Sequence, residues 1–285
     1  MKKYLIISLI AVSILGLGAF AFQRHGTIKQ PDNSVNHKLY VALGDSVAAG
    51  VGLKYNSDSS ACDRTNQSYP NQLAAMRQLN LKNAACSGAT LPNGILGAQN
   101  VNKLTLPSQL QLLFSVTKPA LISLTVGAND IQWTDLLAKC YSSVCGTEED
   151  TAVVNSRFTS LQTNLQLVLQ QIHDHFGARP PEVVVTGYHQ VFPVTILNGC
   201  SDLTGIDSTE LAWGRQLQSQ LSQTIQQTVT GYSFAVYIPI SFKGHELCTA
   251  NPWVQGLTDS QPYHPTSDGQ AAYASQINNA LGKFK

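Results

Sequence analysis

Two kinds of apolar pattern alternate along the chain. Short runs rich in Val, Ile, Leu and Ala predict buried strands, and longer stretches with apolar residues three or four positions apart predict helices. Strands are predicted at 38–43, 81–85, 120–126, 183–186 and 232–238. Helices are predicted at 69–79, 107–116, 131–137, 148–175, 208–229 and 267–282. Because strands and helices alternate, the pattern predicts one α/β domain whose parallel sheet is covered by helices on both faces.

The N-terminus is an apolar segment that is distinct from the rest of the chain. Lys2 and Lys3 precede an uncharged run at 4–22, and the small residues around Phe20 fit signal-peptide cleavage after Ala21. The run is also just long enough to span a bilayer, so an uncleaved membrane anchor is the alternative. We therefore expect a secreted or extracytoplasmic protein, membrane-anchored if the segment is not cleaved. The predicted parts are a signal peptide or anchor at 1–21, a polar linker at 22–37 and a folded domain at 38–285.

Six cysteines follow this segment. An even number of cysteines in an exported chain predicts disulfide bonds. Several pairings are possible, and the simplest joins neighbours along the chain. A zinc site is the alternative, but the sequence contains no Cys-x-x-Cys pair, and we assign no metal. The cysteines are Cys62, Cys86, Cys140, Cys145, Cys200 and Cys248.

The composition limits the kinds of partner. Only 12% of the residues are charged, 43% are apolar, and the formal net charge is +1. No run of basic residues alternates with aromatic residues, so we expect no nucleic-acid partner. The polar surface must consist mainly of Ser, Thr, Asn and Gln, as is common in exported proteins. No internal repeat or second domain is evident, and we expect a monomer.

Polar segments stand where three of the predicted strands end. Gly44-Asp45-Ser46 ends the first strand, Gly88 follows the second, and Gly127-Ala128-Asn129-Asp130 follows the third. His264 precedes the last predicted helix. In a parallel sheet the carboxyl ends of the strands face one edge, so the four segments can converge there.

Together these residues fit acyl-transfer chemistry. The Ser46 hydroxyl would attack an ester carbonyl, and His264 would take its proton and later give it to the leaving alcohol. The backbone N–H groups of Ser46 and Gly88 and the side-chain amide of Asn129 would donate hydrogen bonds to the oxyanion. Each segment alone is a common turn or cap, and their combination is what predicts a catalytic site.

The four segments resemble the SGNH (GDSL) hydrolase family. Gly-Asp-Ser, the single Gly, Gly-x-Asn-Asp and a late His-Pro occur in the family's order, from Gly44 to Pro265. The resemblance implies a flavodoxin-like three-layer α/β/α sandwich with a central parallel sheet of about five strands. It also implies esterase or lipase activity with no metal or other cofactor. Within the family the chain is most similar to exported, disulfide-bonded esterases and phospholipases, which implies the bonds Cys62–Cys86, Cys140–Cys145 and Cys200–Cys248.

One position departs from the family pattern. Most members have an acidic residue three positions before the histidine, where this chain has Gln261. Two groups are candidates to orient His264 instead, namely the carboxylate of Asp259 and a backbone carbonyl such as that of Gln261. The related disulfide-bonded branch includes members that use such a carbonyl, so the resemblance favours a Ser-His dyad. A carbonyl fixes the tautomer of the ring but stabilises its charged form less than a carboxylate does.

The leading hypothesis is an exported serine esterase or lipase that hydrolyses a small-molecule or lipid ester. The first alternative keeps the site but acts on cell-wall sugars, as a carbohydrate O-acetylesterase or an acyltransferase. The second is a catalytically inactive binding module on the same fold, for which Gln261 is the only support. Preference for acyl-chain length and reaction of Ser46 with an organophosphonate distinguish the three hypotheses.

Overall fold

The computed structural model describes residues 37–54, 61–195 and 199–282. The predicted signal peptide at 1–21 lies outside the described residues, as does the predicted linker except for His37. Within the described part of the chain, no helix is both long and apolar enough to cross a membrane. These residues belong to one structural unit that begins at His37.

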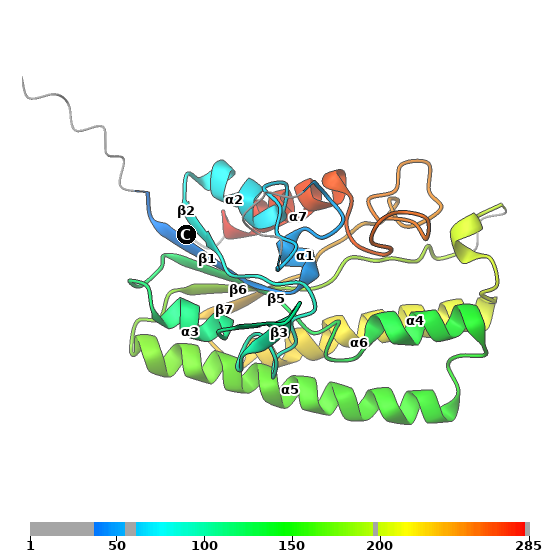
Figure 1. Cartoon of the computed structure of the whole chain (residues 1–285), viewed down its shortest axis with the longest axis horizontal. Helices are drawn as coiled ribbons and strands as arrows, with labels where there is room; N and C mark the ends of the chain where they lie inside the picture. Colours follow the sequence, from blue (N-terminus) through cyan, green and yellow to red (C-terminus); the bar gives the residue numbers. More distant parts are fainter. Residues whose placement is uncertain (1–36, 55–60, 196–198, 283–285) are drawn as a thin grey trace, which may run out of the picture. The chain divides into compact units, whose positions relative to one another are not determined.

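The centre of the domain is a parallel sheet. Its strands are β1 (Leu39–Gly44), β2 (Asn80–Asn83), β5 (Leu121–Thr125), β6 (Glu182–Thr186) and β7 (Ala235–Ile238). They lie in the order β2-β1-β5-β6-β7 and every pair is parallel (Figure 1). β1 and β5 are buried almost throughout, as strands covered on both faces must be. The predicted parallel sheet of about five strands is confirmed.

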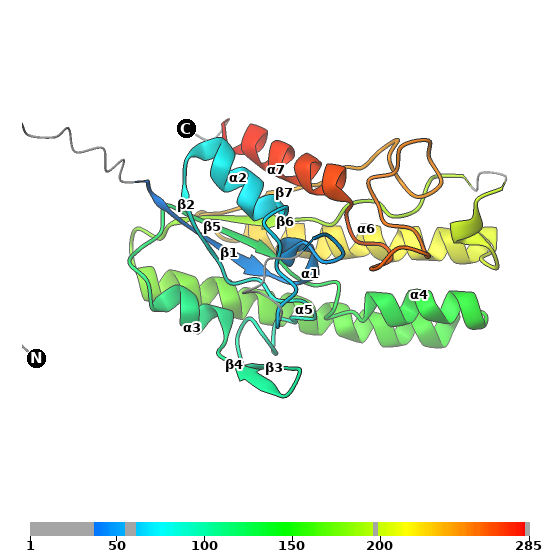
Figure 2. The same cartoon turned by 45° about the horizontal axis from the view of Figure 1, so that its top comes forward.

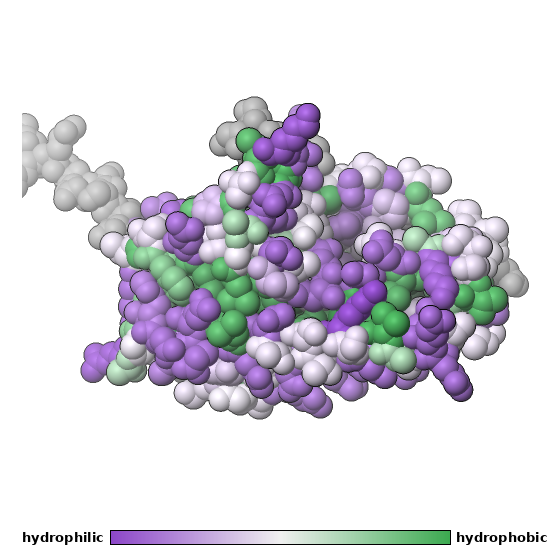
Figure 3. Space-filling view, turned by 60° about the horizontal axis from the view of Figure 1, so that its bottom comes forward, coloured by the Kyte–Doolittle hydropathy of each residue, from purple (hydrophilic) through white to green (hydrophobic). Residues whose placement is uncertain are grey.

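Helices cover both faces of this sheet. They are α1 (Ser46–Ala49), α2 (Tyr69–Arg77), α3 (Gln109–Phe114), α4 (Trp133–Ser142), α5 (Glu148–Phe176), α6 (Ser208–Thr230) and α7 (Ser267–Leu281), with a short 3-10 helix at Ser201–Leu203. α2 and α7 pack together on one face, and α5 and α6 pack together on the other (Figures 1 and 2). The predicted three-layer sandwich is therefore confirmed. On the α5 side, hydrophobic residues form separate groups among hydrophilic ones (Figure 3).

The main differences from the predicted elements concern strands. The last strand is predicted at 232–238 but begins at Ala235, because a turn precedes it in which the Ala235 N–H donates to the Tyr232 carbonyl at 3.0 Å. A hairpin of β3 (Gln99–Val101) and β4 (Leu104–Leu106) is not predicted at all. Its turn residues, Asn102 and Lys103, both have a positive φ, as a type I′ turn requires. A lysine seldom indicates such a turn, so the sequence does not predict this one.

Disulfide bonds join the cysteines in sequence order, as Cys62–Cys86, Cys140–Cys145 and Cys200–Cys248. These are the pairs that the family resemblance implies. The Cys62–Cys86 bond lies beside the end of β1, because the Cys86 N–H donates to the Gly44 carbonyl at 3.0 Å. It therefore ties the loop that contains Cys62 to the edge of the sheet where the predicted site lies.

Removal of the Cys62–Cys86 bond is expected to cost more stability than removal of the Cys140–Cys145 bond. The first bond joins residues 24 positions apart and the second residues 5 apart. Chain entropy then predicts losses of about 3 and about 2 kcal/mol, since a longer loop restricts the unfolded chain more. Thermal unfolding of the two double Cys→Ala variants measures the difference, and equal losses would contradict the loop-length argument.

Candidate active site

Ser46 follows the end of β1 by two residues. Gly44, the last residue of the strand, has a φ of 146°, and a Cβ atom there would lie 2.4 Å from the Thr125 carbonyl oxygen of β5. Only glycine fits such a close approach. Asp45 then caps α1, because its carboxylate accepts the N–H of Val47 at 2.9 Å. Ser46 thus begins the short helix and lines a cleft at the carboxyl edge of the sheet.

The structure brings His264 into contact with Ser46. His264 lies on the loop before α7, and its Nε2 is 2.7 Å from Ser46 Oγ. Its Nδ1 is 3.1 Å from the Pro262 carbonyl oxygen. Because a carbonyl can only accept, Nδ1 carries the proton and Nε2 accepts from the Ser46 hydroxyl. The ring therefore has the tautomer that a general base needs.

The environment of His264 favours its neutral form. Loss of water around the ring lowers its pKa below the ordinary value of 6.5. The carbonyls of Pro262 and Gln261 act in the opposite direction, but their effect is smaller. Nε2 is therefore free to accept a proton at neutral pH.

The carboxylate of Asp259 is not the group that orients His264. It accepts the N–H of Gly256 at 2.8 Å, within a turn in which the Asp259 N–H donates to the Gly256 carbonyl at 3.1 Å. This turn directs the side chain back onto its own loop. The Gln261 carbonyl accepts the backbone N–H of His264 at 3.3 Å. The carbonyl at Nδ1 belongs instead to Pro262, one residue later than the one suggested from the sequence.

The predicted oxyanion donors come from three neighbouring segments. Asn129 lines the same cleft as Ser46 and His264. Its side-chain amide donates to the Ala89 carbonyl at 3.0 Å, which ties it to the segment of Gly88. Gly88 has a φ of 75°, a left-handed conformation that favours glycine. Gly88 is not among the residues that line the cleft with Ser46, and it lines a separate polar hollow.

The cleft has an apolar wall, and the empty space of about 590 Å³ beside this wall includes open solvent at its mouth. The wall combines residues from α1, α4, α6 and the loops after β5 and β6. Such a wall is suited to an apolar ligand that also meets a few polar groups. The apolar residues that line the cleft are Val47, Ala128, Trp133, Val191 and Leu221.

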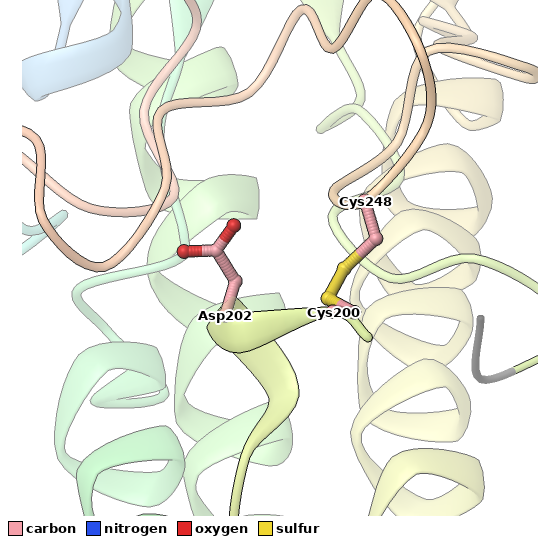
Figure 4. Close-up of side chains that lie close together, drawn as sticks. All are labelled: Cys200, Asp202 and Cys248. Carbon is pink, nitrogen blue, oxygen red and sulfur yellow. A yellow bond between two sulfur atoms is a disulfide. The ribbon is translucent and has the colours of Figure 1, made fainter. Parts of the chain in front are cut away.

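One cluster of two cysteines and an aspartate resembles a metal site but is not one. Within the described residues, Cys200, Asp202 and Cys248 are the one group of potential metal ligands close enough together (Figure 4). The two sulfur atoms form a disulfide and offer no thiolate. An oxygen of Asp202 accepts the N–H of Leu257 at 2.8 Å. The role of this cluster is therefore to hold loops together.

Comparison with known proteins assigns the family. The model of the GDSL-like lipase/acylhydrolase family matches residues 42–272. This chain belongs to that family. The resemblance seen in the four sequence segments is thereby confirmed, and the family's chemistry makes the chain a carboxylic ester hydrolase.

Named relatives of this family member include two lipases. A lipase of Streptomyces rimosus is 31% identical over 249 residues, which cover 85% of this chain and 86% of the relative. Lipase 1 of Streptomyces coelicolor is 30% identical, with the same coverage of both chains. Two similar solved structures are the extracellular lipase of S. rimosus (TM-score 0.64, 28% identity) and phospholipase A1 of Streptomyces albidoflavus NA297 (TM-score 0.66, 27% identity). Each match covers 85% of this chain and 99% of the other.

Two side chains that were not predicted from the sequence hold the backbone and the carboxylate next to Ser46 in place. Gln109, at the start of α3, accepts the Gly44 N–H at 2.7 Å and donates to the Gly44 carbonyl at 2.8 Å. Tyr188, which follows β6, donates to the Asp45 carboxylate and accepts the Ala128 N–H at 3.1 Å. The only sequence signal for Tyr188 is its place after a strand, and Gln109 has none, since it lies within an ordinary helical pattern.

Two buried carboxyl groups, those of Asp45 beside Ser46 and of Asp130, lie close enough to interact with each other. Burial raises the pKa of Asp45 to about 7, although the hydrogen bonds from Tyr188 and Val47 oppose this shift. Burial also raises the pKa of Asp130 to about 6, and one of its oxygens accepts the Leu91 N–H at 2.9 Å. Both carboxyl groups therefore hold a proton more readily than an exposed carboxyl group does.

The pKa of His264 is expected to lie below 6.5, because the charged ring loses solvation in the cleft. Titration of ¹⁵N-histidine-labelled protein by NMR measures it, with the denatured protein as reference and His264→Gln to assign the signal. A value above that of the denatured protein would show that a negative charge, and not desolvation, dominates at this ring.

Proposed function

We propose that the chain hydrolyses esters through a dyad of Ser46 and His264, without a side-chain acid. The observation that carries this proposal is the distance of 2.7 Å between Ser46 Oγ and His264 Nε2. The Pro262 carbonyl, 3.1 Å from Nδ1, takes the place of the usual acid because it holds the ring in the required tautomer.

Acylation begins with attack of Ser46 Oγ on the carbonyl carbon of the ester. As the new C–O bond forms, Nε2 of His264 takes the hydroxyl proton, and the carbonyl electron pair moves onto oxygen. The N–H groups of Ser46 and Gly88 and the amide of Asn129 donate to this oxyanion. When the oxyanion collapses, the bond to the alcohol oxygen breaks and His264 gives its proton to the alcohol.

Deacylation repeats these steps with water. His264 takes a proton from a water molecule, and the oxygen of that water attacks the acyl carbon attached to Ser46. Collapse of the second tetrahedral intermediate releases the carboxylic acid and returns the proton to Ser46 Oγ. Each cycle therefore consumes one ester and one water and restores the enzyme without a metal or cofactor.

For the substrate, we propose an ester with an acyl chain of several carbons, as in a lipid. The support is the apolar wall of the cleft beside Ser46, to which Trp133 and Leu221 contribute. Each buried CH₂ group contributes about 0.8 kcal/mol, whereas an acetyl group would leave most of this wall without a contact. The names of the relatives, lipase and phospholipase A1, agree with such a substrate.

We also propose that the protein acts outside the cytoplasm. Three disulfide bonds are typical of an oxidising compartment, and one related solved structure is of an extracellular lipase. A signal peptide at 1–21 would provide the export route. Cleavage of this segment, its use as a membrane anchor and the monomeric state stay predictions from the sequence.

Ser46→Ala is expected to lower kcat for p-nitrophenyl butyrate by at least about 10³-fold, because the nucleophile is lost. Ser267→Ala is the matched control, since it removes the same hydroxyl from an exposed position three residues after His264. Full activity in folded Ser46→Ala would rule out the dyad. Labelling of the parent protein at Ser46 by an organophosphonate, located by mass spectrometry, distinguishes an enzyme from an inactive binding module.

The value of kcat/KM is expected to rise from p-nitrophenyl acetate to the octanoate, by up to about fourfold per CH₂ group, as the acyl chain fills the apolar wall. Leu221→Asn places an amide in this wall and is expected to reduce hydrolysis of the octanoate more than that of the acetate, which serves as the internal control. A strict preference for acetate would instead support the carbohydrate O-acetylesterase.

A further inference from the structure

A buried histidine outside the dyad contacts the loop that carries His264. His189 follows β6 by three residues and is only 3% exposed. Its ring stacks on Phe242, with ring centroids 4.4 Å apart. Its Nδ1 is 3.0 Å from the Tyr273 hydroxyl of α7, and its Nε2 is 3.0 Å from the Tyr263 carbonyl oxygen. His189 thus connects β6 and α7 to the residue directly before His264.

These contacts decide which nitrogen of His189 carries the proton. Burial lowers the pKa of His189 to about 3, so the ring is neutral and has a single N–H. The Tyr263 carbonyl can only accept, so the proton is on Nε2. The Tyr273 hydroxyl accepts the backbone N–H of His189 at 3.2 Å and donates its own proton to Nδ1. Both ring nitrogens therefore have a partner in this assignment.

Tyr263 has a conformation that needs support. Its φ is 71°, in the left-handed region that a residue with a Cβ atom seldom adopts. Backbone pairing with Gln255 holds the loop, since the Tyr263 N–H donates to the Gln255 carbonyl at 2.9 Å and the Gln255 N–H donates to the His264 carbonyl at 2.8 Å. The Tyr263 carbonyl takes no part in this pairing and accepts the Nε2–H of His189. This carbonyl belongs to the planar peptide unit that also contains the nitrogen of His264.

We propose that His189 is a positioning residue for ester hydrolysis, whose Nε2–H holds the Tyr263–His264 peptide unit so that the His264 ring stays aligned with Ser46 Oγ. This inference rests on the proposed roles of Ser46 and His264. A general base must stay within hydrogen-bond reach of the proton it takes. A displacement of about 1 Å costs up to about 10²-fold in rate, so one hydrogen bond to the preceding peptide is enough to affect catalysis.

Two other roles of His189 would give different results. His189 also lines the cleft, and a role in binding the substrate would raise KM when the side chain is changed. A purely structural role would lower the stability of the protein but leave kcat of the folded protein unchanged. A positioning role lowers kcat of the folded protein and leaves KM close to that of the parent.

Three variants separate these roles in assays with p-nitrophenyl butyrate. His189→Phe keeps a ring against Phe242 but removes the donor, and kcat is expected to fall about 10- to 100-fold with KM within about threefold of the parent. His189→Gln places an amide nitrogen near the position of Nε2 and is expected to recover most of kcat. Tyr273→Phe is the matched control, because it removes the buried partner of the other ring nitrogen and is expected to keep kcat within about threefold of the parent.

The proposal is overturned if folded His189→Phe has the kcat of Tyr273→Phe, if His189→Gln recovers nothing, or if only KM changes. The ¹⁵N spectrum of the histidine-labelled parent protein gives a test that does not depend on the folding of any variant. A neutral His189 ring with its proton on Nε2 is expected, and a proton on Nδ1 would refute the proposal.

The two proposals fail in different ways. Inactive Ser46→Ala together with unimpaired His189 variants would remove only the positioning role. An active Ser46→Ala would remove the dyad itself.

Discussion

The close contact between β1 and β5 at Gly44 determines the position of Ser46, the proposed nucleophile. A side chain at Gly44 would collide with the Thr125 carbonyl, and the N–H of Asp45 donates to that same carbonyl at 3.0 Å. The Gln109 amide satisfies both backbone polar groups of Gly44 in the buried interior. Displacement of this strand end would leave buried polar groups without partners, at about 1–3 kcal/mol each. Ser46 therefore has a fixed position, and His264, the proposed base, lies within hydrogen-bond distance of it.

A neutral carbonyl at Nδ1 of His264, in place of a carboxylate, changes how readily the ring takes up and gives away a proton. A carboxylate at Nδ1 would stabilise the charged ring strongly, whereas the Pro262 carbonyl offers only a dipole. Desolvation lowers the pKa of His264 further. The ring is thus a weaker base toward Ser46 but a stronger acid toward the leaving alcohol. In the proposed mechanism the oxyanion donors then have to supply more of the stabilisation during attack.

The sequence was sufficient to predict the five strands of the central sheet and the candidate site residues, because both produce local patterns. Ser46 and His264 stand beside predicted elements, and parallel topology alone implies that strand ends converge. The supporting contacts could not be predicted, since Gln109 acts on a residue 65 positions away and Tyr188 on one 143 positions away. A backbone carbonyl such as that of Pro262 has no signature in residue type. Asp259 was a reasonable candidate by distance along the chain, and only the turn at Gly256 directs it elsewhere.

The loop that carries His264 is held by neutral hydrogen bonds. The left-handed conformation of Tyr263 costs roughly 1–2 kcal/mol, and each hydrogen bond that supports the loop contributes about 0.5–1.5 kcal/mol, so the bonds from Gln255 and His189 together offset it. The Gln255 side chain adds two more, to the carbonyls of Val51 and Pro265. Because none of these groups carries a charge at neutral pH, salt does not screen them. The position of His264, the proposed base, is then expected not to depend on ionic strength, and the pH dependence of ester hydrolysis is expected to follow the protonation of its ring.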